Sequence, residues 1–203
     1  TENMLTSKEL YRQLMHLIIG AGVVVTYYFD ILSPLAVFLM LIVGGLASVL
    51  CKRVRLPFFS YFLDHFERDE MKQTFPGRGM IFFFVGVLLV MQLFEKDIAL
   101  AAIIILALGD SISHIVGERF GHIKNIFNGN SKKLFEGTLA GTIAGTLGAL
   151  LFVPFPEALV GSFAAMIAEV IEIDLNSKPL DDNLIVPLVA GTVIMLVRKY
   201  VGF

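Results

Sequence analysis

The chain has 203 residues, of which 56% are hydrophobic and 17% charged, and its mean hydropathy is +0.78. This composition excludes an ordinary soluble globular domain, in which about half of the residues are apolar and about a quarter are charged. It predicts an all-α integral membrane protein. The formal net charge of −2 indicates no class of partner, because the charges are segregated along the chain.

Seven apolar runs approach the length of about 20 residues that a membrane-spanning helix needs. They cover residues 14–29, 34–51, 79–94, 98–108, 134–153, 158–173 and 184–197. The fourth run is short, but it can continue as a helix through residues 111–116, whose polar groups must then face protein or water. We therefore expect a single domain over residues 1–203, a bundle of about seven transmembrane helices.

Lysine and arginine residues fall mainly on one side of these runs. The N-terminus and the second, fourth and sixth connections hold most of them, whereas the other side holds Lys96, Arg198 and Lys199. The positive-inside rule therefore predicts a cytoplasmic N-terminus and a C-terminus outside. The polar clusters then share the cytoplasmic face, which nucleotides can reach, and the outer halves of the runs are almost purely apolar.

Between the second and third runs, Phe58, Phe62 and Phe66 recur every four residues. This spacing predicts an amphipathic helix, which either lies in the membrane interface or caps the bundle.

Residues 109–141, GDSISHIVGERFGHIKNIFNGNSKKLFEGTLAG, form a polar, glycine-punctuated stretch between two apolar runs. Acids that can hold a divalent cation are mixed there with bases that can hold phosphate, so the stretch suits a polyphosphate ligand. The side chains concerned are Asp110, Ser113, His114, Lys124, Lys132, Lys133, Glu136 and Thr138, with Gly117, Gly121 and Gly137 between them. Gly137, Gly141 and Gly145 are spaced four apart, which is also the pattern of close helix packing.

Further polar groups lie at the same ends of other runs. Asp181, Asp182 and Asn183 precede the last run, where helix capping is the alternative interpretation. Glu169 and Glu172 are three residues apart, so either can point into the bundle. His16 follows Arg12 by one helical turn, which makes it a phosphate or hydroxyl contact if it is not simply a packing residue.

Several familiar sites are absent from the sequence. It has no P-loop, no kinase-type glycine-rich loop and no zinc-ligand spacing. Ser111, Ser113, His114 and Asp110 share one short segment without a G-x-S-x-G elbow, which argues against a serine hydrolase.

The motifs GDSISHIVGERFG, KK-x-x-EGTLAG and DDNLIVPL, together with RQLMH and PGRG, resemble those of the CTP-dependent lipid kinases. These are dolichol and polyprenol kinase, phytol kinase and the CTP-using diacylglycerol kinase of yeast, and the resemblance to compact microbial members runs from Arg12 to Pro187. It implies transfer of the γ-phosphoryl group of CTP to the hydroxyl of a membrane lipid alcohol, with Mg²⁺ or another divalent cation.

The resemblance, together with the residue patterns described above, indicates roles for individual residues. The expected catalytic residues are Asp110, Glu136, Asp182 and His16, and the expected metal ligands are Asp110, Glu136, Asp182 and Glu172. The expected nucleotide site comprises Lys124, Lys132, Lys133, Gly117, Gly121, Gly137, Ser113, Thr138, Asn183, Arg12 and Arg78. The expected partners are CTP, the lipid alcohol and membrane lipids, with a second copy of the chain left open and no nucleic acid.

Two other functions remain open. The first half of the stretch is also similar to the CDP-diacylglycerol synthases, which would make the protein a cytidylyltransferase, although their C-terminal signature is absent. A transporter or channel would require polar groups along the whole depth of the bundle.

Overall fold

The computed structural model describes residues 7–51, 54, 75–123, 134–171, 174–175 and 178–201. These residues are helical apart from their turns and one antiparallel pair of two-residue strands, β1 (Asp174–Leu175) and β2 (Lys178–Pro179). The helices are α1 (Ser7–Tyr28), α2 (Pro34–Cys51), α5 (Arg78–Leu93), α6 (Lys96–Ile104), η1 (Ile105–Asp110), α7 (Ser111–Phe120), α8 (Phe135–Ala149), α9 (Phe155–Ile171) and α10 (Asp182–Val201). Since α6, η1 and α7 are contiguous, seven helical segments correspond to the seven predicted runs, and the all-α fold class is confirmed.

Three of these segments are long and apolar enough to cross a membrane. They are Pro34–Cys51, Lys96–Phe120 and Asp182–Val201, and Arg78–Leu93 is apolar but shorter. Their length and composition suggest a membrane protein.

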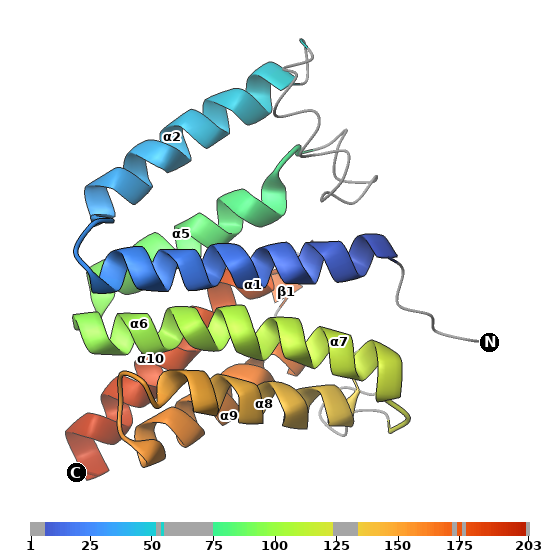
Figure 1. Ribbon diagram of the computed structural model, residues 1–203, viewed down its shortest axis with the longest axis vertical. Helices are drawn as coiled ribbons and strands as arrows, with labels where there is room; N and C mark the ends of the chain where they lie inside the picture. The colour runs from blue at the N-terminus through green and yellow to red at the C-terminus, as the bar shows by residue number, and fades with distance from the viewer. Residues whose placement is uncertain are drawn as a thin grey trace.

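The Lys96–Phe120 segment is the centre of the fold. Every residue from Ile98 to Ala107 is buried, as expected for a helix that is apolar on all sides and lies inside a bundle. Those neighbours are α1, α5, α8 and α10. Figure 1 shows α6 and α7 crossing the middle of the molecule, with α1 along one side and α8 along the other.

The central segment contains one π-helical stretch, η1. A π turn closes its hydrogen bonds one residue later than an α turn, so it rotates the face that α7 presents relative to α6. Small residues let η1 pack closely on its neighbours: Ala107 lies against Gly20 of α1, and Gly109 lies against Gly141 of α8.

Glycine also brings α7 and α8 together. A Cβ atom on Gly137 would lie 2.5 Å from the carbonyl oxygen of Ser113 and 3.1 Å from the Cα atom of Gly117. A Cβ atom on Gly141 would lie 2.7 Å from the carbonyl oxygen of Gly109. The predicted packing role is confirmed for Gly141, and Gly137 shares it.

Helix α2 is the most exposed of the three membrane-length segments. Val37 and Ser48 are its buried residues, and Ser48 Oγ donates a hydrogen bond to the carbonyl oxygen of Pro76 at 2.6 Å. Figure 1 shows α2 diverging from the other helices.

The helix directions gather the polar segments at one end of the bundle. The N-termini of α1, α5, α8 and α10 and the C-termini of α7 and α9 lie at the end drawn on the right of Figure 1. We call this the site end, and the other the opposite end.

Candidate functional site

Two buried acids and a partly exposed imidazole lie close together where η1 and α7 meet the end of α9. His114 Nε2 is 3.6 Å from Asp110 Oδ1, one helical turn earlier. Glu169, near the C-terminus of α9, completes a set in which one ligand atom from each residue lies within 4.8 Å of the others. Asp110 is 8% exposed and Glu169 is 1% exposed. We call Asp110, His114 and Glu169 the inner set.

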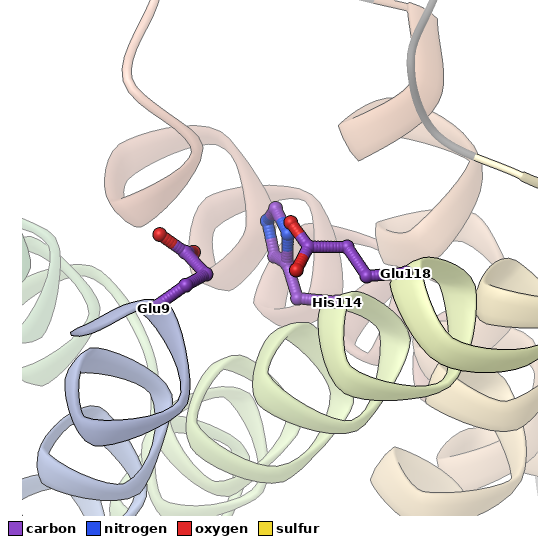
Figure 2. Close-up of side chains that lie close together, drawn as sticks. All are labelled: Glu9, His114 and Glu118. Atoms are coloured by element: carbon purple, nitrogen blue, oxygen red, sulfur yellow. The ribbon is translucent and has the colours of Figure 1, made fainter. Parts of the chain in front are cut away.

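A second group shares the same imidazole. Ligand atoms of Glu9, His114 and Glu118 also lie within 4.8 Å of one another, and all three residues are partly exposed. Figure 2 shows Glu118 beside the His114 ring on α7, with Glu9 approaching from α1. The Glu9 carboxylate is ion-paired with Arg12 and accepts a hydrogen bond from Gln13 Nε2 at 3.1 Å. We call Glu9, His114 and Glu118 the outer set.

His16 lies close to the inner set from the α1 side. Its ring makes an edge-to-face contact with Phe83, at 4.9 Å between centroids. Its Nε2 atom is buried and has no hydrogen-bond partner among the residues that the structure describes. Asp110 is the charged group that acts on His16 most strongly, with Arg12, His114 and Asp181 also within electrostatic range.

The start of α10 is organised by Asp181. Its Oδ1 atom accepts hydrogen bonds from the backbone N–H of Asn183 at 3.2 Å and from Asn183 Nδ2 at 2.8 Å. Its Oδ2 atom lies 3.4 Å from Arg78 Nε at the start of α5. Asp181 therefore caps α10, as the alternative interpretation predicted. Asp182 is the first residue of the helix and is half-buried.

Glu136 has a different environment from the inner set. Its Oε1 atom accepts hydrogen bonds from the backbone N–H groups of His122 at 2.9 Å and Ile123 at 3.1 Å. These bonds tie the first turn of α8 to the chain that leaves α7. Glu136 is therefore an anchor of this junction, and it belongs to neither of the two sets.

Other predicted nucleotide-site residues lie in the contact between α7 and α8. A Cβ atom on Gly121 would collide with Leu134 and with the carbonyl oxygen of Gly117. Ser113 and Thr138 are buried, at 6% exposure each. This arrangement gives the three predicted glycines, Gly117, Gly121 and Gly137, a packing function.

Several predicted residues lie outside the described part of the chain. They are Lys124, Lys132, Lys133, Glu172 and the segment at residues 58–66. Among the described residues, the structure brings together two groups of predicted residues. The first group is Asp110, His16 and Arg12. The second group is Arg78, Asp182 and Asn183, which lie beside Asp181. Sequence reasoning missed Glu9 and Glu118, and it did not count His114 among the possible metal ligands. The spacing of Asp110, His114 and Glu118, four residues apart on one helix, was the available signal.

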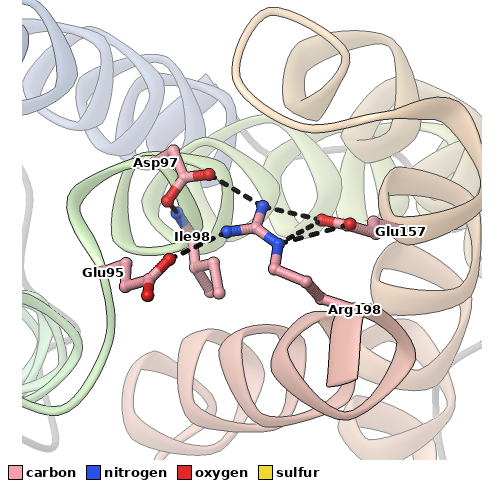
Figure 3. A network of polar contacts seen from close by, with 5 residues as sticks. All are labelled: Glu95, Asp97, Ile98, Glu157 and Arg198. Carbon is pink, nitrogen blue, oxygen red and sulfur yellow. Dashed lines mark hydrogen bonds and ion pairs between the residues drawn. The ribbon is translucent and has the colours of Figure 1, made fainter. Parts of the chain in front are cut away.

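The opposite end carries a second ionic cluster, where we expected almost purely apolar helices. Arg198 Nη2 lies 2.8 Å from Glu157 Oε2 and 2.7 Å from Asp97 Oδ2, and Nη1 lies 3.1 Å from Glu95 Oε2. Figure 3 shows the guanidinium of Arg198 surrounded by these carboxylates. Glu157 is 2% exposed. The cluster joins α6, α9 and α10 at the end of the bundle farthest from the inner set.

The donor chemistry of the inner set suits a divalent cation, because carboxylate oxygens and an imidazole nitrogen converge on one point. Arg12 and Arg78 add two positive charges at the same end of the bundle, each paired with an acid.

A comparison of the chain with protein-family models, curated proteins and solved structures finds no match.

Proposed function

We propose that this protein is a membrane-embedded, CTP-dependent kinase that phosphorylates the hydroxyl of a lipid alcohol of the polyprenol or dolichol type. The observation that carries the proposal is the meeting of Asp110, His114, Glu169 and His16 at the end of a bundle with membrane-length apolar helices. The resemblance of the stretch at residues 109–141 to the CTP-dependent lipid kinases supplies the nucleotide and the acceptor class.

The proposed reaction requires little covalent chemistry from the protein. The hydroxyl oxygen of the lipid forms a bond to the γ-phosphorus of CTP while the bond from that phosphorus to the β,γ-bridging oxygen breaks, which yields the lipid phosphate and CDP. The hydroxyl proton passes to a base. Catalysis then consists mainly of aligning the two reactants and neutralising charge on the phosphates.

The inner set fits the cation that this reaction uses. Candidate ligand atoms of two buried carboxylates and an imidazole, from η1, α7 and α9, lie within 4.8 Å of one another. A divalent ion held there would neutralise phosphate charge and orient the transferring group. We therefore propose Asp110, His114 and Glu169 as the metal ligands. Glu169 takes the place of Glu136, which the sequence analysis predicted as a ligand, because the Glu136 oxygens accept backbone hydrogen bonds.

Two arginines at the site end are the proposed phosphate contacts within the described residues. Arg12 is paired with Glu9 and Arg78 with Asp181. A phosphate can form a bidentate pair with a guanidinium, as a carboxylate does, so it can replace these carboxylates. Lys133 remains a proposed contact from the sequence motif, and Asp110, Asp182 and His16 remain the proposed proton acceptors.

The proposed topology follows from the positive-inside rule. All seven helical segments would span or enter the membrane, with the site end and the N-terminus at the cytoplasm. The lipid tail would enter sideways between helices, so that its hydroxyl meets the nucleotide at the membrane surface.

Labelled CTP tests the proposal directly. The purified protein in lipid nanodiscs is given a panel of lipid alcohols and CTP that carries ³²P at either the α or the γ position, with ATP as a comparison. Label in the lipid from γ-labelled CTP alone supports the kinase. Label from α-labelled CTP supports the cytidylyltransferase instead, and the absence of lipid labelling from either form refutes both.

A matched pair of variants connects the activity to the site. Asp110→Asn should lower turnover by about 100-fold or more, because it removes a charge next to the transferring group. Asp30→Asn makes the same chemical change at an exposed acid of the opposite end, which is paired with Lys96, and should leave turnover unchanged. Equal activities of the two variants would remove Asp110 from the site.

A further inference from the structure

We infer that the inner set binds a divalent transition-metal ion of the Co²⁺ and Zn²⁺ class in preference to Mg²⁺, and that His114 is the ligand that creates this preference. The inference deepens the proposed function, since the same cation would serve phosphoryl transfer. Cation binding can nevertheless be measured without any nucleotide or lipid.

The donor atoms of the inner set favour metal ions that accept nitrogen. Mg²⁺ and Ca²⁺ take oxygen ligands, and Mg²⁺ gives up its bound water reluctantly. Imidazole nitrogen favours the later ions of the first transition series, whose affinities for mixed nitrogen and oxygen sites exceed those of Mn²⁺. The inner set offers one imidazole and two carboxylates. A site for Mg²⁺ alone would be built from oxygen ligands and would not include an imidazole.

The candidate ligand atoms of Asp110, His114 and Glu169 lie within 4.8 Å of one another. Ligands about 2.1 Å from a tetrahedral ion lie about 3.4 Å apart, so small side-chain rotations would close the set on an ion. Asp110 and His114 are one turn apart on the same helical segment, which fixes their relative position.

His16 lies near Asp110 from the α1 side, and its buried Nε2 atom has no hydrogen-bond partner among the described residues. A buried polar atom without a partner costs free energy. His16 therefore adds a second nitrogen donor within electrostatic range of Asp110, which strengthens the preference for ions that accept nitrogen.

The outer set is the competing position for such an ion, because it uses the same imidazole. Glu9 is already engaged by Arg12 and Gln13, and the guanidinium repels a cation. Both outer carboxylates are also more exposed than Asp110 and Glu169. The inner set is therefore the one that we assign.

Direct titration tests the inference. Untagged protein in detergent is stripped of metal with a chelator and titrated with Co²⁺, whose visible absorption reports nitrogen coordination, and Mg²⁺ is then added as a competitor. We expect Co²⁺ to bind at least about tenfold more tightly than Mg²⁺. His114→Asn should weaken Co²⁺ binding by about tenfold or more and shift the absorption band. His122→Asn, at an exposed histidine of the same region, should change neither.

Defined results would overturn the inference. Equal affinities of the wild-type protein for Co²⁺ and Mg²⁺ would do so, and this comparison needs no variant to fold. An unchanged Co²⁺ spectrum in His114→Asn would do so as well. Glu118→Gln separates the two sets: unchanged Co²⁺ affinity supports the inner set, and a loss comparable to that of His114→Asn refutes it. Selective Co²⁺ binding without CTP turnover would refute the proposed function and leave this inference standing.

Discussion

Gly137→Ala is the substitution whose effect the structure specifies most closely. The new Cβ atom would lie 2.5 Å from the carbonyl oxygen of Ser113, whereas ordinary contacts begin at 3.4 Å. The opposing atoms belong to the α7 backbone, so α7 and α8 must separate locally by about 0.9 Å. Overpacking of this kind costs about 2–3 kcal/mol. The higher helix propensity of alanine recovers about 1 kcal/mol, so we expect a net loss of about 1–2 kcal/mol.

The measurement is equilibrium unfolding in mixed micelles, with the helix signal followed as the SDS fraction rises. Gly22→Ala is the matched control, since it makes the same change within α1 and its Cβ atom would meet nothing within 4 Å. It should be neutral or slightly stabilising. If Gly137→Ala unfolds at the same SDS fraction as Gly22→Ala, the packing interpretation of Gly137 is refuted, and its place in the sequence motif needs another explanation.

Two further predictions concern charged residues. Arg198→Gln should destabilise the protein by about 3 kcal/mol, because it leaves the buried carboxylate of Glu157 without its guanidinium partner. Lys199→Gln, at an exposed neighbour, should change the unfolding midpoint little. Equal midpoints for the two variants would contradict this prediction. Glu136→Gln should strongly lower lipid phosphorylation, because an uncharged amide oxygen accepts hydrogen bonds more weakly than a carboxylate from the two backbone N–H groups that anchor the junction of α7 and α8. Turnover like that of the wild type would exclude Glu136 from any role in the reaction.

The helical segments were predictable because each is marked by a long apolar run and bounded by polar or turn residues. Periodicity alone predicted that Gly141 would pack against another helix, and the structure confirms it. The π-helical stretch η1 was not predictable, because nothing in the residues 105–110 distinguishes it from an α-helix. Its geometry depends on contacts with α1, α8, α9 and α10.

The candidate site was predicted only in part. Asp110 stood out because a carboxylate at the edge of an apolar run is energetically costly. Glu169 and Glu172 could not be separated, since their spacing places both on one helical face. Glu9 and Glu118 were missed because they lie in polar flanks, where charge is expected. The Arg198 cluster joins residues 41 and 103 positions apart, a separation at which sequence patterns give no pairing.

The π turn in the central segment has a consequence for how the chain tolerates changes in length. Each residue of an α-helix turns the chain by about 100°, so removing one residue between Ile105 and Asp110 would swing the Asp110 and His114 side chains away from α9. Adding one would turn them by a similar angle in the other sense. Homologous chains that keep Asp110 and His114 should therefore vary in the loops around this segment while its residue count stays constant.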